Sequence, residues 1–235
     1  MDLLGPGTST AMTTEPRIRF LGVTDYVATW RAMQAFTEAR DANTSDEIWL
    51  TEHPPVYTLG LAGRPQHTVR SNGIPLIKTD RGGQVTYHGP GQMVAYLMLD
   101  LRRAKLGVRE MVCRIEMAVI NLLATFGVSA YGKRSAPGVY VDRDGTEAKI
   151  AALGLRVRNG CTYHGVAMNV DMDLKPFRDI DPCGYPGLEV AQLADFGVKL
   201  SLDEAGRRFA PLLAAQFALT EEKSAVPGIP SPAFA

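Results

Sequence analysis

The stretch from Asp80 to Gln92 restricts the possible fold more than any other part of this chain. It holds four glycines and one proline in thirteen residues and leads into the strand-like segment Val94 to Asp100. Such a stretch is too costly in backbone entropy to form an ordinary strand, and glycine is typical where the backbone approaches a ligand or adopts a positive φ. A plain surface turn would explain only its Gly-Pro-Gly end. Because Arg81, Tyr87 and His88 are interspersed among the glycines, we predict a loop that lines a functional site.

Two further segments carry glycine inside an apolar run. The segment Tyr163 to Val170 resembles a strand broken by Gly165, and Lys149 opens a glycine-punctuated apolar run that ends at Leu155. A glycine inside a strand indicates a bulge or the close approach of another backbone. Three such places in one chain predict a single shared pocket.

Cys183 and Lys149 are the candidates for nucleophilic chemistry. Cys183 lies in a turn-like stretch between Asp181 and Gly184, where a thiol can meet a substrate. Cysteine attacks as its thiolate, so its free pKa of about 8.5 has to be lowered for reaction near neutrality. A partly desolvated lysine amine can accept the thiol proton and stay beside the thiolate as an ammonium. The alternative is an inert thiol and a solvated charge, because sequence alone does not bring the two residues together.

Strand and helix patterns alternate along the chain. We expect helices at 25–40 and 108–123, and strands at 17–23, 48–51, 56–59 and 162–170, with a hairpin of 138–141 and 148–157. Asp144 and Gly145 are a strong signal for the hairpin turn. Ser201 followed by Glu204 predicts the start of a final helix, which Pro211 should break or kink. Mixed strands with hairpins and interspersed helices predict an α+β layered domain, not a doubly wound sheet.

The charge balance excludes a broad basic surface for nucleic acid. Lys and Arg number 25 and Asp and Glu number 25, so the formal net charge is zero. A local basic patch for an acidic protein partner and a set of scattered solvated charges are equally compatible with the sequence. The candidates for such a patch are Arg64, Arg70, Arg81, Arg156 and Arg158.

Cysteine and histidine usage argues against both a disulfide framework and a metal site. Three cysteines are an odd number and fit a reducing compartment. We assign Cys113 to packing within the predicted helix, and Cys161 has no activating residue near it in the sequence. There is no Cys-x-x-Cys spacing, and the four histidines show no metal-ligand pattern.

The sequence gives no sign of targeting or membrane insertion. The first residues lack the basic and apolar regions of a signal peptide, and no apolar run approaches the ~18 residues needed to span a bilayer. We therefore expect a cytoplasmic protein with no membrane partner. Gly, Thr and Ser at the start and prolines at the end predict disordered segments at 1–15 and 223–235, around a single catalytic domain at 16–222.

Five motifs, in family order, resemble the lipoyl(octanoyl) transferases, and the resemblance extends over roughly positions 17 to 220. They are Glu52–Thr58, Arg81–Gln92, Lys149–Leu155, Tyr163–Asn169 and Pro182–Gly184. The resemblance implies a biotin/lipoate protein ligase-like fold, in which a mixed, mainly antiparallel sheet is flanked by helices. It also implies transfer of an octanoyl or lipoyl group from acyl carrier protein to a lysine of lipoyl domains, as the first step of endogenous protein lipoylation. The implied acceptors are the lipoyl domains of 2-oxoacid dehydrogenase complexes and the glycine cleavage H protein, and no cofactor is implied.

The same resemblance assigns the site residues. It implies that Cys183 carries the acyl thioester and that Lys149 lowers the pKa of its thiol. It implies an acyl pocket lined by Arg81, Gly82, Gly83, Gln84, Val85, Thr86, Tyr87, His88, Ala152, Leu153, Gly154, Gly165, Val166 and Ala167. From the glycine placement we expect the oxyanion donors to be backbone N–H groups near Gly165 and Cys183.

His88 and His164 have two possible roles. Either could relay a proton, or each could hold its glycine-rich segment by hydrogen bonds. We favour support, because the Cys183 and Lys149 pair already covers the proton transfers that the reaction needs.

Two alternative functions are compatible with parts of this pattern. An ATP-dependent lipoate or biotin ligase would share the fold but needs no nucleophilic cysteine, and its nucleotide loop differs from the sequence Arg81 to Gln84. A non-catalytic acyl-binding module would have a similar pocket and would tolerate loss of Cys183. Transfer from octanoyl carrier protein without ATP would separate these alternatives from acyl transfer.

Overall fold

A mixed sheet of eight strands forms the centre of the protein. The computed structural model describes residues 15–63, 72–180 and 188–218. The strand order is β1-β2-β6-β10-β9-β8-β7, and β11 pairs separately with β9. The β1–β2 and β11–β9 pairs are parallel, and the other pairs of this sheet are antiparallel. The strands are β1 (Arg17–Val23), β2 (Glu47–Glu52), β6 (Gln92–Met98), β7 (Ala130–Gly132), β8 (Val139–Arg143), β9 (Thr146–Arg158), β10 (Cys161–Asn169) and β11 (Glu189–Val190).

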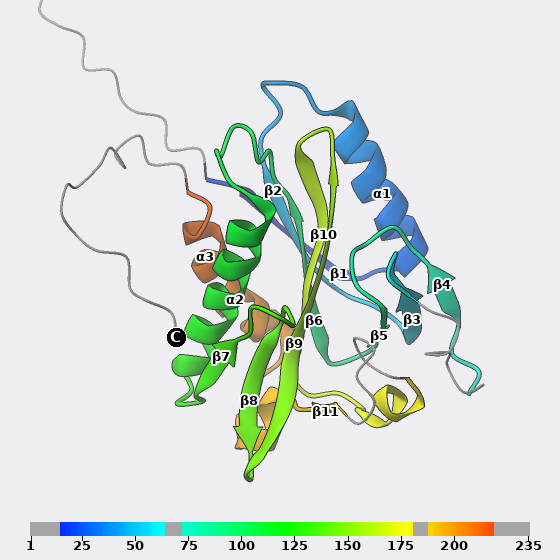
Figure 1. The fold of residues 1–235 in the computed structure, drawn as a ribbon, viewed down its shortest axis with the longest axis vertical. Coiled ribbons are helices and arrows are strands. Elements are labelled where there is room, and N and C mark those ends of the chain that lie inside the picture. The colour runs from blue at the N-terminus through cyan, green and yellow to red at the C-terminus, as the bar shows by residue number, and fades with distance from the viewer. Residues whose placement is uncertain (1–14, 64–71, 181–187, 219–235) are drawn as a thin grey trace, which may run out of the picture.

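Helices cover both faces of this sheet (Figure 1). The larger core packs α2 (Val108–Ala124) and α3 (Leu202–Ala215) against one face, through residues such as Ile115 and Phe209. On the other face, α1 (Tyr26–Ala39) contributes Met33 to a smaller core with Tyr96 and Tyr163. The three layers confirm the predicted α+β architecture, a mainly antiparallel sheet flanked by helices.

A second sheet of three strands accompanies the main one. Its order is β4-β3-β5, where β3 is Val56–Leu59, β4 is Leu76–Lys78 and β5 is Val85–His88. Tyr57, Tyr87 and Phe177 form its own small core together with the 3₁₀ helix η2 (Lys175–Asp179). A further 3₁₀ helix, η4 (Leu193–Phe196), precedes α3. The small sheet carries the glycine-rich stretch on its β5 strand, which leads directly into β6 of the main sheet.

Local signals in the sequence account for most of these elements. The Asp25 carboxylate accepts a hydrogen bond from the Ala28 N–H at 2.8 Å and so begins α1. Asp144 and Gly145 both have positive φ, 54° and 82°, as the tight hairpin between β8 and β9 requires. The Ser201 hydroxyl accepts from the Glu204 N–H at 3.2 Å at the start of α3.

Two expectations about helices need correction. Pro211 does not break α3, which continues to Ala215, because Pro211 lies on the exposed side of the helix, where water can satisfy the carbonyl that loses its intrahelical partner. Cys113 is exposed and does not contribute to packing, because the buried stripe of α2 passes through Met111, Ile115 and Val119 instead.

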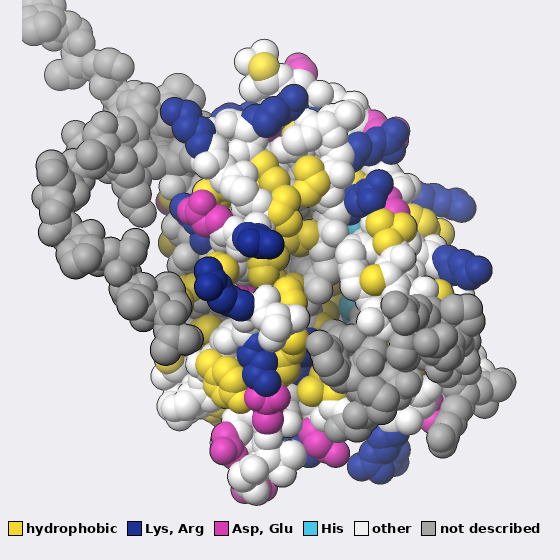
Figure 2. All heavy atoms as spheres, in the orientation of Figure 1, with side chains coloured by type: hydrophobic (Ala, Val, Ile, Leu, Met, Phe, Trp, Pro, Cys, Tyr) yellow, Lys and Arg dark blue, Asp and Glu magenta, His cyan; other side chains and the backbone are white. Residues whose placement is uncertain are grey.

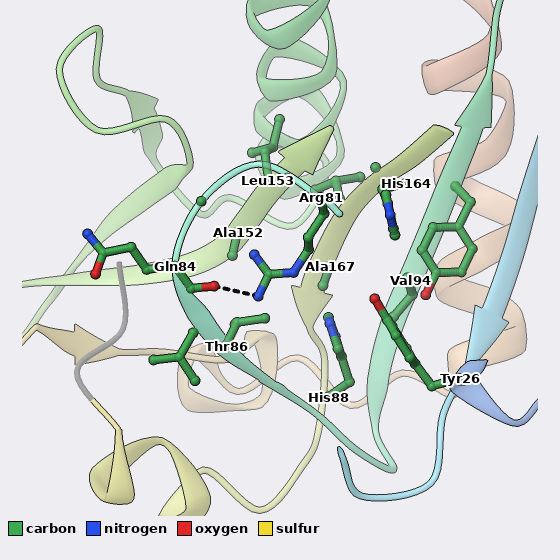
Figure 3. Close-up of a pocket in the computed structure, with 16 residues that line it drawn as sticks. Tyr26, Arg81, Gln84, Thr86, His88, Val94, Ala152, Leu153, His164 and Ala167 are labelled. Atoms are coloured by element: carbon green, nitrogen blue, oxygen red, sulfur yellow. Dashed lines mark hydrogen bonds between the residues drawn. The ribbon is translucent and has the colours of Figure 1, made fainter. Parts of the chain in front are cut away.

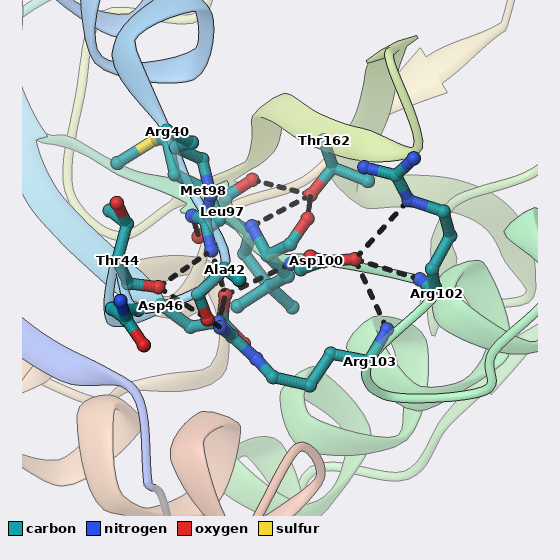
Figure 4. A network of polar contacts seen from close by, with 12 residues as sticks. Arg40, Ala42, Thr44, Asp46, Leu97, Met98, Asp100, Arg102, Arg103 and Thr162 are labelled. Carbon is teal, nitrogen blue, oxygen red and sulfur yellow. Dashed lines mark hydrogen bonds and ion pairs between the residues drawn. The ribbon is translucent and has the colours of Figure 1, made fainter.

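A polar network closes one end of the sheet (Figure 4). Asp46 Oδ1 accepts from the guanidinium groups of Arg40 at 2.5 Å and Arg103 at 2.6 Å, and from the Asp100 N–H at 2.9 Å. Arg40 also donates to the Met98 carbonyl at 2.7 Å, and its side chain is 3% exposed. A single carboxylate therefore joins the chain after α1 to the end of β6.

The described residues contain no helix that is long and apolar enough to cross a membrane. The two terminal segments predicted to be disordered lie almost entirely outside the described ranges.

Candidate functional site

A pocket lies between the main sheet and the small sheet (Figure 3). The glycine-rich loop and β5 form one side, and β6, β9 and β10 form the floor. The hollow encloses about 520 Å³, part of which is open to solvent. Its lining residues are Tyr26, Arg81, Gly83, Gln84, Val85, Thr86, His88, Val94, Tyr96, Ala152, Leu153, Gly154, His164, Gly165, Val166 and Ala167.

All the residues predicted to line an acyl pocket are in this set except Gly82 and Tyr87. Gly82 donates its N–H to the Leu155 carbonyl at 2.9 Å and so attaches the loop to β9. The Tyr87 ring packs against Tyr57 and Phe177 in the core of the small sheet. Three segments that are distant in sequence thus meet at one hollow.

The pocket floor contains two glycines, Gly154 and Gly165, where other backbones approach closely. A Cβ atom added to Gly165 would lie 1.9 Å from the Ala95 carbonyl oxygen, and one added to Gly154 would lie 2.9 Å from the Gly82 oxygen. Gly165 pairs with Tyr96 on β6 and with Gly154 on β9. Its own N–H therefore points toward a neighbouring strand, and the expected oxyanion donors near Gly165 and Cys183 stay a prediction.

Arg81 is turned inward and is 7% exposed. Its guanidinium donates to the Thr58 carbonyl at 2.6 Å, to the Gln84 carbonyl at 2.7 Å and to the Gly82 carbonyl at 2.9 Å. These bonds attach the glycine-rich loop to β3 of the small sheet. Arg81 thus anchors the loop and, being buried, is excluded as a candidate for a basic surface patch.

Asp80 joins the loop to α1 and to β10, and sequence reasoning missed it. Its carboxylate accepts from Trp30 Nε1 of α1 at 2.8 Å, from His164 Nε2 of β10 at 2.9 Å, and from the Tyr163 hydroxyl. Burial alone would raise the pKa of Asp80, but the hydrogen bonds from His164 and Tyr163 hold that pKa well below its usual range. Its position at the start of the glycine-rich stretch was the one available signal.

His88 and His164 are both held by the protein. His88 Nδ1 lies 2.7 Å from Gln92 Oε1, and its ring stacks on Tyr26 at a centroid distance of 5.7 Å. Burial lowers the pKa of His88 to about 3 and also lowers that of His164, so both rings are neutral near pH 7. His164 adopts a positive φ of 61°, which is uncommon for a residue with a side chain. These contacts fit the favoured supporting role.

Lys149 reaches the pocket face of the sheet because β9 contains a bulge. Val139 of β8 pairs with Ala151, whereas Tyr140 pairs with Lys149, so Ile150 has no partner on β8. Ile150 and Ala151 both pack in the larger core, and strict alternation is interrupted there. Lys149 therefore lines a second hollow, which shares Thr86, Ala152 and Ala167 with the main pocket.

The Lys149 ammonium is enclosed by protein. The residue is 4% exposed, and Nζ donates to the Pro137 carbonyl at 3.3 Å. Nζ also lies 4.9 Å from the centre of the Tyr140 ring, a distance at which a cation is attracted to the ring face.

Cys183 lies outside the described residues, so its distance from Lys149 stays a prediction. The described chain resumes at residue 188, and β11 then pairs with β9 so that Val190 lies opposite Lys149. The chain downstream of Cys183 thus returns to the strand that carries Lys149.

The surface around this region is rich in cations. Figure 2 shows a hydrophobic band down the middle of one face, with Lys and Arg side chains on both sides of it. Arg156 and Arg158 of β9 are exposed, and Arg158 pairs with Glu38 at 2.5 Å. Arg64 and Arg70, the other candidates for a basic patch, lie outside the described residues. In the described ranges, no three His, Cys, Asp or Glu side chains are grouped in a way that could hold a metal ion.

Comparison with known proteins identifies the family of this chain. The family model for the lipoyl protein ligase A/B catalytic domain matches residues 25–214. The chain belongs to this family. An octanoyltransferase of Dechloromonas aromatica is 60% identical over 201 residues, which is 86% of this chain and 96% of that protein. An octanoyltransferase of Aromatoleum aromaticum is 63% identical over 181 residues, 77% of either chain.

Solved structures of the family share the architecture at much lower identity. A bi-partite lipoate protein ligase of Thermoplasma acidophilum superimposes with a TM-score of 0.69 at 20% identity, covering 86% of this chain and 84% of that one. A lipoate-protein ligase A bound with ATP gives a TM-score of 0.70 at 20% identity, with 86% and 85% coverage. These structures confirm the predicted ligase-like fold.

Proposed function

We propose that this protein transfers an octanoyl group from acyl carrier protein to a lysine of a lipoyl domain, through a thioester on Cys183. The observation that carries the proposal is the high identity to octanoyltransferases over nearly the whole family domain. The meeting of the predicted pocket segments beside Lys149 adds support.

The proposed first half-reaction exchanges one thioester for another. The Cys183 thiolate attacks the octanoyl carbonyl, the bond to the carrier thiolate breaks, and that thiolate takes from Lys149 the proton that came from Cys183, which leaves Lys149 neutral. Lys149 keeps Cys183 ionised beforehand by accepting its proton. Because a thioester donor is already activated, this step needs no ATP.

In the second half-reaction the acceptor lysine attacks the Cys183 thioester. Lys149 accepts a proton from the incoming amine, the new amide forms, and Cys183 leaves as a thiolate. Val85, Val94, Leu153 and Val166 provide apolar wall for the hydrocarbon chain, where each buried CH₂ contributes about 0.8 kcal/mol. The cations beside the hydrophobic band suit carrier and acceptor proteins of acidic surface.

Intact-mass spectrometry tests this proposal directly. The pure protein is incubated with octanoyl carrier protein, without ATP, and then with a lipoyl domain that lacks its modification. We expect an octanoyl adduct on the protein first, which then disappears as the lipoyl domain gains the same mass. Transfer that requires ATP and free octanoate would instead support the ligase alternative, and binding without any adduct would support an acyl-binding module.

A further inference from the structure

Glu116 is a buried carboxylate that the proposed chemistry does not use. It lies in the middle of α2 and is 8% exposed, next to the core residues Ile115 and Val119. A carboxylate at such a position is costly unless protein groups hydrogen-bond it or compensate its charge. Glu116 takes part in none of the ion pairs found among the described residues, so its partners have to be sought in the backbone.

The carboxylate fits into a notch left by two glycines. Glu116 Oε1 accepts the Gly138 N–H at 2.8 Å. A Cβ atom on Gly132 would lie 2.8 Å from Oε2, so that strand approaches the carboxylate as closely as a backbone can. Helix α2 is thereby connected to the chain that precedes β8.

The same short segment forms the wall around the Lys149 ammonium. The Pro137 carbonyl accepts from Lys149 Nζ at 3.3 Å, and the next residue is the one that Glu116 binds. A Cβ atom on Gly138 would lie 2.9 Å from Lys149 Cε and 3.1 Å from Nζ, and Gly138 adopts a φ of 146°. A shift of residues 137–138 would therefore move the contacts that fix the ammonium.

We propose that Glu116 is a positioning residue for Lys149, which it holds through the backbone of Pro137 and Gly138. The proposal rests on the proposed role of Lys149 in acyl transfer. Lys149 has to meet first the thiol and then the incoming amine, so a small displacement of Nζ slows both steps. The negative charge of Glu116 also acts on Lys149 through space, but the hydrogen bond to Gly138 is the contact that fixes its geometry.

Three substitutions separate geometry from charge. Glu116→Gln keeps an oxygen that can accept the Gly138 N–H and loses the charge. Glu116→Asp keeps the charge but is one methylene too short to reach. Glu116→Ala loses both, and Ile115→Val on the same helix is a matched control for loss of stability, because it removes one core methyl group and keeps the hydrogen bond from Gly138 to Glu116.

Kinetics of acyl transfer give the first readout, taken below the melting temperature of every variant. We expect Glu116→Asp and Glu116→Ala to lower kcat about 10- to 100-fold with KM nearly unchanged, as displacement of a reacting group predicts. Glu116→Gln and Ile115→Val should stay within about threefold of the wild type. A wild-type kcat in Glu116→Ala, a glutamine variant as slow as the alanine variant, or a raised KM at unchanged kcat would each overturn the proposal.

The second readout does not depend on acyl transfer. Lys149 is labelled with an amine-reactive ester at fixed pH, and its modification rate is followed by peptide mass spectrometry. We expect faster labelling in Glu116→Asp and Glu116→Ala, because residues 137–138 are then no longer held and the Lys149 amine becomes more accessible. Glu116→Gln and Ile115→Val should label at the wild-type rate. Equal labelling in all four variants would overturn the positioning role. A wild-type protein that forms no octanoyl adduct but shows this labelling pattern would instead contradict only the proposed function.

Discussion

Lys149 and Tyr140 lie opposite each other on β9 and β8, and the ammonium nitrogen of Lys149 is 4.9 Å from the centre of the Tyr140 ring. A ring face stabilises the ammonium, while burial favours the neutral amine. The proposed function requires Lys149 to accept and release a proton in this environment, so Lys149 is the first position to test.

Lys149→Arg should lower the rate of acyl-enzyme formation by at least about 100-fold. Arginine keeps the positive charge but does not deprotonate, and general base catalysis typically contributes 10²–10⁴-fold. Rapid-quench mass spectrometry of a single turnover measures this rate. Tyr140→Phe is the matched control, because it keeps the ring and removes only the hydroxyl that donates to the Ala136 carbonyl at 2.8 Å. Wild-type turnover by the arginine variant would contradict the assigned role of Lys149.

Cys183→Ser should abolish the octanoyl adduct while binding of the carrier protein persists. A serine hydroxyl is far harder to ionise than a thiol, so the proposed base Lys149 cannot generate the nucleophile at neutral pH. Intact mass and a carrier-binding titration report the two properties separately. Cys113→Ser serves as the control, since Cys113 is exposed on α2. An octanoyl adduct formed by the Cys183→Ser protein at the wild-type level would show that the nucleophile is another residue.

The buried His88 predicts a loss of stability in acid. Its pKa is about 3 in the folded protein and about 6.5 in the unfolded chain. Between these values the unfolded chain binds a proton at His88 and the folded protein does not. The contribution of neutral His88 to the free energy of unfolding is therefore lost as pH falls from about 6.5 toward 3. One such group gives a slope of about 1.4 kcal/mol per pH unit in the free energy of unfolding.

His88→Gln provides the test of that slope. Urea unfolding is measured between pH 4 and pH 6.5. The free energy of unfolding should depend on pH less steeply in the variant, by about 1.4 kcal/mol per pH unit, which corresponds to one proton. The absolute stability will fall as well, since the variant loses the stacking on Tyr26. Identical slopes in both proteins would mean that His88 is protonated in the folded state.

Asp46→Ala should destabilise the fold by about 3–5 kcal/mol, because it leaves the buried Arg40 guanidinium without its carboxylate. Asp46→Asn should cost less, since an amide oxygen can still accept hydrogen bonds. Urea unfolding at pH 7 gives both values. The Asp46 network contains none of the residues that line the pocket, so the transfer rate of folded protein should stay unchanged. A loss below 1 kcal/mol for the alanine variant would show that Arg40 finds another partner.

Local sequence patterns predicted much of the fold. β1 and β3 have the predicted bounds, and the hairpin turn at Asp144 and Gly145 is where its dipeptide indicates. These features depend on neighbouring residues alone, so a single sequence is enough to find them. The family and its ligase-like fold, inferred from five motifs, are confirmed by the comparisons.

Features that depend on contacts between distant segments were harder to predict. The sequence did not indicate that Arg81 would turn inward to bind Thr58, or that Asp80 would join α1 to β10. Nothing in the motif around Gly165 reveals that β10 has a neighbour on each side. Burial and hydrogen-bond partners follow from strand pairing, which local patterns do not specify.

The unpaired Ile150 has a consequence for how this protein can change over time. If β9 alternated strictly from Ala151 back to Lys149 with Ile150 kept, the Lys149 side chain would face α2, and the amine would be separated from the pocket by the thickness of the sheet. A change that straightens the strand at this point would therefore turn the amine away from the pocket even if every side chain of the site were retained. We expect variation in β9 to preserve the bulge.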